Sequence, residues 1–180
     1  MKLKWKKIKE KSYQVGYRKI VRKTFELPDG KIVDFDIKQE GPAVCVLAIT
    51  QENNIILAKQ YRPGPEKVLV EMPGGKVETG ESAKFAIKRE LLEETGYTGK
   101  FIFVGTTLDC AYSSMIRYNF LGINCQKIQE PISENNEFIE VIEMSINRFR
   151  KELKKGQMTD IESGYLCLNF LDDNFNLFSI

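Results

Sequence analysis

Residues 75–97 read GKVETGESAKFAIKRELLEETGY and combine a glycine-containing loop with a strongly acidic helix. Apolar side chains recur at spacings of three and four between Ala83 and Leu91, which is the period of one face of an α-helix. We therefore expect a helix over residues 81–95. Gly96 is expected to end it, because glycine readily adopts the left-handed conformation found at helix C-termini.

The predicted helix brings several acidic side chains together. Glu90 and Glu94 lie one turn apart, with about 6 Å between their Cβ atoms, and Glu93 flanks them. Repulsion at this spacing costs about 0.2–0.5 kcal/mol per pair, which suggests a compensating cation. A solvated acidic helix face is the alternative interpretation. The adjacent glycine loop, and Arg89 as a possible orienting partner, favour a cation site.

The composition narrows the chemistry of that site. The chain has no histidine, which excludes His metal ligands, Ser-His triads and His-based pH switches. Its four cysteines form no CxxC pair, so we expect reduced, buried thiols rather than a zinc knuckle or a redox dithiol. Carboxylate oxygens alone favour Mg²⁺ or Mn²⁺. Mg²⁺ held by few carboxylates completes its shell with water and substrate phosphates, which indicates phosphate chemistry.

The same stretch resembles the Nudix box, Gly-x5-Glu-x7-Arg-Glu-U-x-Glu-Glu-x-Gly-U, where U is a bulky apolar residue. All nine specified positions match, and they are Gly75, Glu81, Arg89, Glu90, Leu91, Glu93, Glu94, Gly96 and Tyr97. The resemblance implies an α+β fold, an αβα sandwich with a mixed central sheet and a small N-terminal antiparallel sheet. It also implies hydrolysis of a nucleoside diphosphate linked to another moiety.

The resemblance further implies roles for individual residues. Glu90 and Glu94 would hold Mg²⁺ or Mn²⁺, assisted by Glu93 and by the carbonyl of Gly74. Four other residues would brace the box without touching substrate: Gly75, Glu81, Arg89 and Gly96.

Segments outside the box are similar to the ADP-ribose and nucleoside-diphosphate-sugar pyrophosphatase branch of that family. They are Gln60-Tyr61-Arg62-Pro63 and Val70-Glu71-Met72-Pro73-Gly74-Gly75. By this likeness Arg62 and Glu71 would line the diphosphate and ribose. The early strands would form a small sheet that helps to build a homodimer, with Tyr17 and Phe35 stacking on the base. Ordinary sheet packing is the alternative for these two aromatics.

Two loops leave parts of the likeness open. In the segment 133–140, Glu137 is the best candidate for a further metal ligand or catalytic base, but Asn135 stands where some relatives have a glutamate. The base is therefore Glu137, Glu134 or Glu93. At 111–112, Ala-Tyr replaces the proline usual in ADP-ribose-selective members, so the particular sugar nucleotide stays open.

Alternating and continuous apolar runs predict the remaining elements. Strands are expected at 13–25, 31–38, 43–49, 55–61, 68–71, 101–106, 116–123 and 138–144, and helices at 146–155 and 160–171. We divide the chain into a hairpin and dimerisation segment, 1–40, and a hydrolase domain, 41–180. The lysine-rich stretch before residue 12 is expected to be a solvated tail or an edge strand.

The chain-wide properties bound the location and the partners. Lys plus Arg number 27 against 25 Asp plus Glu, so the net charge of +2 gives no reason to expect nucleic-acid binding. No apolar signal-peptide core follows the N-terminal lysines and no run of 18 apolar residues occurs, so we expect a cytoplasmic protein without a membrane partner.

The sequence thus predicts a Mg²⁺-dependent pyrophosphatase that splits ADP-ribose or another nucleoside diphosphate sugar into a nucleoside monophosphate and a sugar phosphate. One alternative is a hydrolase of nucleoside triphosphates or dinucleoside polyphosphates that uses the same box. The other is a module that senses nucleotides or binds RNA and has lost hydrolysis, although such a module does not need all of Glu90, Glu93 and Glu94.

Overall fold

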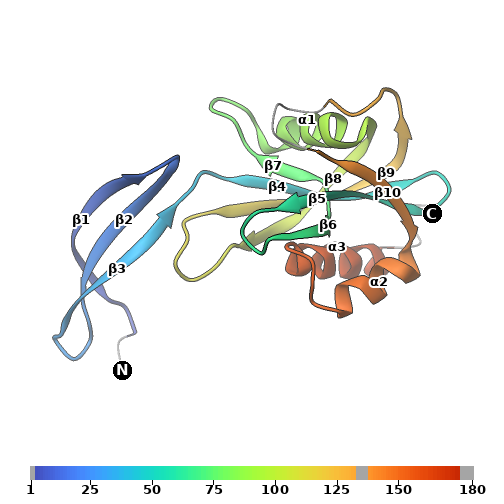
Figure 1. The fold of residues 1–180 in the computed structure, drawn as a ribbon. Coiled ribbons are helices and arrows are strands. Elements are labelled where there is room, and N and C mark those ends of the chain that lie inside the picture. The colour runs from blue at the N-terminus through green and yellow to red at the C-terminus, as the bar shows by residue number, and fades with distance from the viewer. Residues whose placement is uncertain (1–2, 133–137, 175–180) are drawn as a thin grey trace. The chain divides into compact units, whose positions relative to one another are not determined.

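The computed structural model describes residues 3–132 and 138–174. The chain divides into two compact units (Figure 1). The first is built from residues 1–42 and 108–116, and the second from residues 43–107 and 117–180.

The first unit is a three-stranded antiparallel sheet in the order β1-β2-β3. Its strands are β1 (Lys6–Val15), β2 (Arg18–Glu26) and β3 (Ile32–Gln39). Segment 108–116 pairs with β3, because the Lys38 amide donates to the Tyr112 carbonyl at 2.8 Å and the Ser114 amide donates to the Lys38 carbonyl at 3.0 Å. The lysine-rich stretch is an edge strand, one of the two forms expected for it.

The prediction of one strand over residues 13–25 is wrong. Gly16 has a positive φ of 60°, so the chain turns there and divides the expected strand between β1 and β2. Glycine carries no penalty for this conformation. Apolar residues lie on both sides of the break, which explains why hydrophobic patterning alone did not detect it.

The second unit contains a mixed seven-stranded sheet. The order is β10-β5-β4-β9-β8, with β6 added to β5 and β7 added to β4. The strands are β4 (Ala43–Thr50), β5 (Asn54–Arg62), β6 (Lys67–Glu71), β7 (Gly74–Lys76), β8 (Tyr97–Leu108), β9 (Ile116–Lys127) and β10 (Glu140–Ser145). β4 is parallel to β9 and antiparallel to β5 and β7. Every residue of β4 is buried, which agrees with the continuous apolar run that predicted this strand.

Helices cover both faces of this sheet (Figure 1). Val44, Val46 and Ala48 of β4 share a core with helix α1 (Ala83–Thr95). The alternate residues Cys45, Leu47 and Ile49 share a second core with α2 (Ile146–Lys154) and α3 (Ile161–Asp173). Because strand side chains alternate between the two faces, one strand supplies both cores. The predicted αβα sandwich is confirmed.

The boundaries of α1 have clear local causes. Ser82 is its N-cap, and the side-chain oxygen accepts a hydrogen bond from the Phe85 amide. Gly96 ends the helix at a φ of 77°, and its amide donates to the Leu92 carbonyl. Among the described residues, no helix is both long and apolar enough to cross a membrane.

Substitution of Gly96 tests how the end of this helix is built. A Cβ on Gly96 would lie 2.0 Å from the Gln129 carbonyl oxygen, whereas one on Gly80, at a similar φ of 84°, would meet nothing within 4 Å. Each alanine variant should lose about 1–2 kcal/mol of stability from the left-handed backbone. Gly96→Ala should lose about 1–3 kcal/mol more from the clash. Urea unfolding measures both variants, and equal losses would contradict this account.

Candidate active site

The carboxylates of α1 and the loop that precedes the helix line an open cavity of about 890 Å³ in the second unit. The loop enters from β6 through Pro73 and continues as β7, which pairs with the central strand β4. The lining includes Arg62, Gly74, Gly75, Glu90, Glu93 and Glu94. Residues predicted separately from the helix and from the loop therefore line one cavity.

The guanidinium of Arg89 contacts three acids of the box. Arg89 donates from Nε to Glu81 Oε1 at 3.1 Å and from Nη1 to Glu93 Oε2 at 2.9 Å. Its Nη2 lies 3.0 Å from Glu90 Oε1 and donates to the Lys76 carbonyl at 3.1 Å. The hydrogen bonds that Arg89 donates to Glu81 and Glu93, with the charge of Glu90, hold the pKa of Arg89 above its ordinary value. In turn, the hydrogen bond from Arg89 lowers the pKa of Glu81, so this ion pair stays charged at neutral pH.

Gly74 and Gly75 of the loop make room for the carboxylates of Glu90 and Glu94. A Cβ on Gly75 would lie 2.3 Å from Glu90 Oε1, so only glycine lets that carboxylate rest against the loop. The Gly74 amide donates to Glu94 Oε2 at 3.0 Å. A Cβ on Gly74 would lie 2.2 Å from the Val44 carbonyl oxygen of β4. The loop therefore packs closely between the central strand β4 and the acidic face of α1.

The donor atoms at this point suit a hard divalent cation. Glu90 and Glu94 reach the same short loop from successive turns of α1, and both present carboxylate oxygens. Glu93, which is about one-third exposed, turns one oxygen to Arg89. Across residues 3–132 and 138–174, no three His, Cys, Asp or Glu side chains converge closely enough to ligate one ion. The predicted pair of carboxylates and the glycine backbone nevertheless lie together.

Arg62 lies at the end of β5 and lines this cavity, and its guanidinium is hydrogen-bonded to the buried carboxylate of Glu71. Its Nε donates to Glu71 Oε2 at 2.6 Å. Arg62 is 38% exposed in its side chain, whereas the Glu71 side chain is only 3% exposed. The other Glu71 oxygen, Oε1, accepts a hydrogen bond from Thr159 Oγ1. Glu71 therefore lies beneath the cavity surface, where it contacts Arg62 directly.

Comparison with known proteins identifies the family. The NUDIX domain family matches residues 39–161, which is more than half of the chain and includes the loop, α1 and Arg62. The chain belongs to the NUDIX family.

Relatives extend this result over most of the chain. It is 36% identical over 146 residues to an ADP-ribose pyrophosphatase of Bacillus subtilis, covering 78% of this chain and 77% of that one. It is 34% identical over 139 residues to the methanol dehydrogenase activator of Bacillus methanolicus, covering 75% of each chain. A crystal structure titled as an ADP compounds hydrolase superposes with a TM-score of 0.80 at 16% identity, over 95% of this chain and 96% of that chain, which shows the shared fold.

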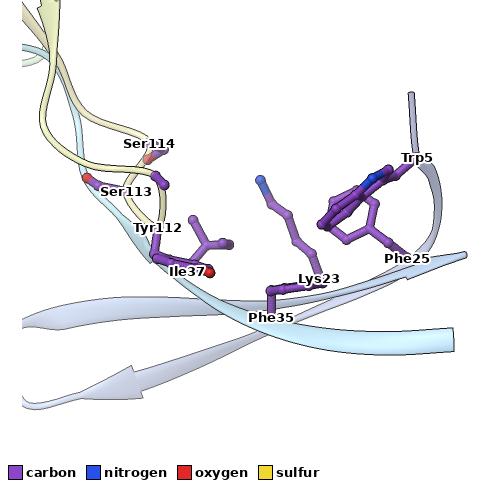
Figure 2. A pocket seen from close by; sticks show the side chains of 9 residues that line it. Trp5, Lys23, Phe25, Phe35, Ile37, Tyr112, Ser113 and Ser114 are labelled. Atoms are coloured by element: carbon purple, nitrogen blue, oxygen red, sulfur yellow. The ribbon is translucent and has the colours of Figure 1, made fainter. Parts of the chain in front are cut away.

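The first unit has an aromatic pocket of about 380 Å³ that includes Phe35, one of the two aromatics predicted to contact a base. The Phe35 ring centroid lies 5.3 Å from that of Trp5 and 6.3 Å from that of Tyr112, with which it is stacked. Figure 2 shows the Lys23 side chain extending between Tyr112 and Trp5. Tyr17 lies elsewhere, at the turn between β1 and β2, and is 80% exposed. Of these two aromatics, Phe35 lines this pocket and Tyr17 does not, while Trp5 and Tyr112 also line it and were not named by the sequence analysis.

The remaining predicted residues, Glu134, Asn135 and Glu137, lie outside the described residues. Thr159 is a functional candidate that the sequence analysis missed, because a lone threonine between two helices belongs to no motif.

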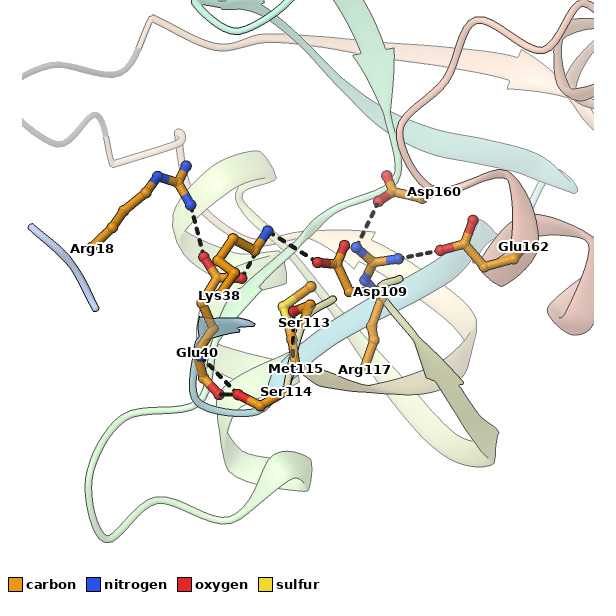
Figure 3. A network of polar contacts seen from close by, with 10 residues as sticks. All are labelled: Arg18, Lys38, Glu40, Asp109, Ser113, Ser114, Met115, Arg117, Asp160 and Glu162. Atoms are coloured by element: carbon orange, nitrogen blue, oxygen red, sulfur yellow. Dashed lines mark hydrogen bonds and ion pairs between the residues drawn. The ribbon is translucent and has the colours of Figure 1, made fainter. Parts of the chain in front are cut away.

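Asp160, which follows Thr159, is a buried acid in the second unit. Figure 3 shows Arg117 between two carboxylates, 3.9 Å from Asp160 Oδ1 and 2.6 Å from Glu162 Oε1. Burial raises the pKa of Asp160 to about 6, and the charges of Glu71 and Glu162 add to the rise, although Arg117 and the Met72 backbone oppose it. Asp160 therefore holds its proton to a higher pH than an ordinary aspartate.

This raised pKa predicts a pH-dependent stability. The ordinary pKa of an aspartate is 3.8 and that of folded Asp160 is about 6, so the folded state holds the proton more tightly. Stability is therefore lost as the pH rises through this window. Between about pH 4.5 and about pH 7.5 the wild type should lose about 2 kcal/mol that Asp160→Asn does not lose. Urea unfolding of both proteins at the two pH values measures this, and a constant difference between them would refute the prediction.

Proposed function

We propose that this Nudix protein hydrolyses the diphosphate of ADP-ribose or another nucleoside diphosphate sugar, giving a nucleoside monophosphate and a sugar phosphate. The observation that carries the proposal is the cavity in which Glu90 and Glu94 meet the glycine loop and Arg62 contributes a positive charge. A cavity lined by both carboxylates and a guanidinium suits a substrate that binds through both a cation and its own phosphate oxygens. The similarity to the ADP-ribose pyrophosphatase of Bacillus subtilis supports the substrate class.

Glu90 and Glu94 would hold the divalent cation, Mg²⁺ or Mn²⁺, with help from the Gly74 carbonyl. The cation would supply neutralisation of the diphosphate charge and a more acidic water molecule. Arg89 keeps the carboxylates in place before substrate arrives, because it bridges Glu81, Glu90 and Glu93. The site is therefore arranged in advance of binding, which lowers the cost of reaching the transition state.

Arg62 would bind the diphosphate through the part of its guanidinium that Glu71 does not occupy. A guanidinium presents several N–H groups in a planar fork, so one can bind Glu71 while others face the cavity. This makes Glu71 a residue that acts through Arg62, since its carboxylate is buried.

The proton from the attacking water requires an acceptor. Glu93 already uses one oxygen to bind Arg89. We therefore propose Glu137 first, with Glu134 and Glu93 as the alternatives.

The first unit would contribute to base recognition and to a homodimer. The aromatic rings around Phe35 offer flat apolar faces of the kind on which a nucleobase stacks, and this supports Phe35 more than the exposed Tyr17. We retain residues 1–40 as the proposed dimerisation segment.

Product analysis tests the proposed reaction. The protein is incubated with Mg²⁺ and, separately, ADP-ribose, GDP-mannose, UDP-glucose, a dinucleotide and a nucleoside triphosphate, and products are identified by mass spectrometry. A nucleoside monophosphate with a sugar phosphate is the expected result. Cleavage of only the triphosphate or dinucleotide would assign the site to one of those substrates instead, and binding without turnover would favour a sensing module.

Glu94→Gln should reduce turnover by at least about 100-fold, because it removes a charge from the proposed cation site while keeping an oxygen for the Gly74 amide. Glu78→Gln is the matched control, since Glu78 is an exposed acid that lines the same cavity. Circular dichroism should show the same fold for both variants. Near-normal turnover by Glu94→Gln would contradict the assignment.

A further inference from the structure

We propose that Thr159, in the segment between α2 and α3, is a positioning residue that orients Arg62 toward the substrate diphosphate. The proposal rests on the proposed function, because it takes Arg62 as a diphosphate ligand. It assigns a role in substrate binding to a segment far from the Nudix box in sequence.

Thr159 and Arg62 are connected through the buried carboxylate of Glu71. Thr159 Oγ1 donates to Glu71 Oε1, and Arg62 Nε donates to the other oxygen, Oε2, at 2.6 Å. The Glu71 side chain is 3% exposed, so water is not available to replace a lost partner. A carboxylate held at both oxygens has one orientation, and the guanidinium that binds it is oriented in turn.

Asp160, which follows Thr159, adds a second contact between the α2–α3 segment and the end of β6. Asp160 is hydrogen-bonded to the backbone of Met72, so two consecutive residues of the α2–α3 segment bind two consecutive residues at the end of β6. Within the described part of the chain, the Asp160 side chain makes no capping hydrogen bond to α3, although it occupies the N-cap position. Its carboxylate is directed instead to Met72 and Arg117.

The residues that Thr159 and Asp160 bind lie between Arg62 and the glycine loop along the path of contacts and chain. The Glu71 side chain binds Arg62, although across the β5–β6 pair Glu71 lies opposite Ala58 and Arg62 opposite Lys67. Met72 continues through Pro73 to the glycine loop. Met158, which precedes Thr159, is buried in the core shared by α2, α3 and β4, so the anchoring segment is itself fixed. Thr159 therefore connects the helices α2 and α3, through Glu71, to Arg62 in the lining of the cavity.

A purely structural role would be that Thr159 only satisfies a buried oxygen. The two roles differ in what they do to binding. If Thr159 acts through Arg62, its loss weakens substrate binding only while Arg62 is present. If it only stabilises the fold, its loss lowers stability and leaves the kinetic constants of the folded enzyme unchanged.

The test compares Thr159→Val, which removes the hydroxyl at nearly constant volume, with Thr159→Ser, which keeps it. Each is made in the wild type and in Arg62→Ala, and kcat and KM are measured for the sugar nucleotide identified by product analysis. Binding of ADP by calorimetry is the second readout and serves alone if no sugar nucleotide is cleaved.

We expect Thr159→Val to raise KM and the Kd for ADP by about tenfold with a smaller change in kcat, and Thr159→Ser to stay within about twofold of wild type. In the Arg62→Ala background, Thr159→Val should have no further effect. Unchanged constants for folded Thr159→Val, or an equal effect with and without Arg62, would overturn the positioning role. Unchanged constants for Arg62→Ala alone would overturn the proposed role of Arg62 as well, while turnover of a sugar nucleotide would still uphold the reaction.

Discussion

The guanidinium of Arg89 is the interaction on which the site depends. Four acids fall in or next to one helix, and their mutual repulsion would otherwise spread them into solvent. Arg89 contacts Glu81, Glu90 and Glu93 at 2.9–3.1 Å and also binds a backbone carbonyl of the loop. It therefore ties the acidic helix to the glycine loop and keeps three carboxylates next to one another. A lysine offers neither the number nor the fixed geometry of these donors.

The central strand makes this interaction possible. β4 is buried along its whole length and places alternate residues in two cores, one under α1 and the other under α2 and α3. The same strand pairs with β7 and leaves room only for glycine at position 74. Consequently α1 and the loop are both fixed to one rigid element, and the carboxylates of Glu90 and Glu94 need little rearrangement to act together.

The sequence predicted those parts that depend on local periodicity and fixed spacing. Helix α1, predicted over residues 81–95 and found over Ala83–Thr95, and the buried strand β4 were predicted because period, composition and end signals agreed. The turn at Gly16 was missed, because a single glycine between apolar residues resembles a tolerated strand position. The Thr159–Glu71 contact joins residues 88 positions apart, and no local pattern records such a contact. Similarly, Tyr112 meets Phe35 only through the pairing of segment 108–116 with β3, and Trp5 meets Phe35 through the pairing of β1, β2 and β3.

Binding of Mn²⁺, followed by electron paramagnetic resonance without substrate, tests the central claim most directly. The claim is that Glu90, which contacts Arg89, and Glu94, which accepts from the Gly74 amide, hold the divalent cation. The wild type and the Glu78→Gln control should bind Mn²⁺ with the same affinity, and a Glu90→Gln/Glu94→Gln double variant should bind at least about tenfold more weakly. If the double variant binds Mn²⁺ as tightly as the wild type, the cation lies elsewhere and the account of this site is wrong.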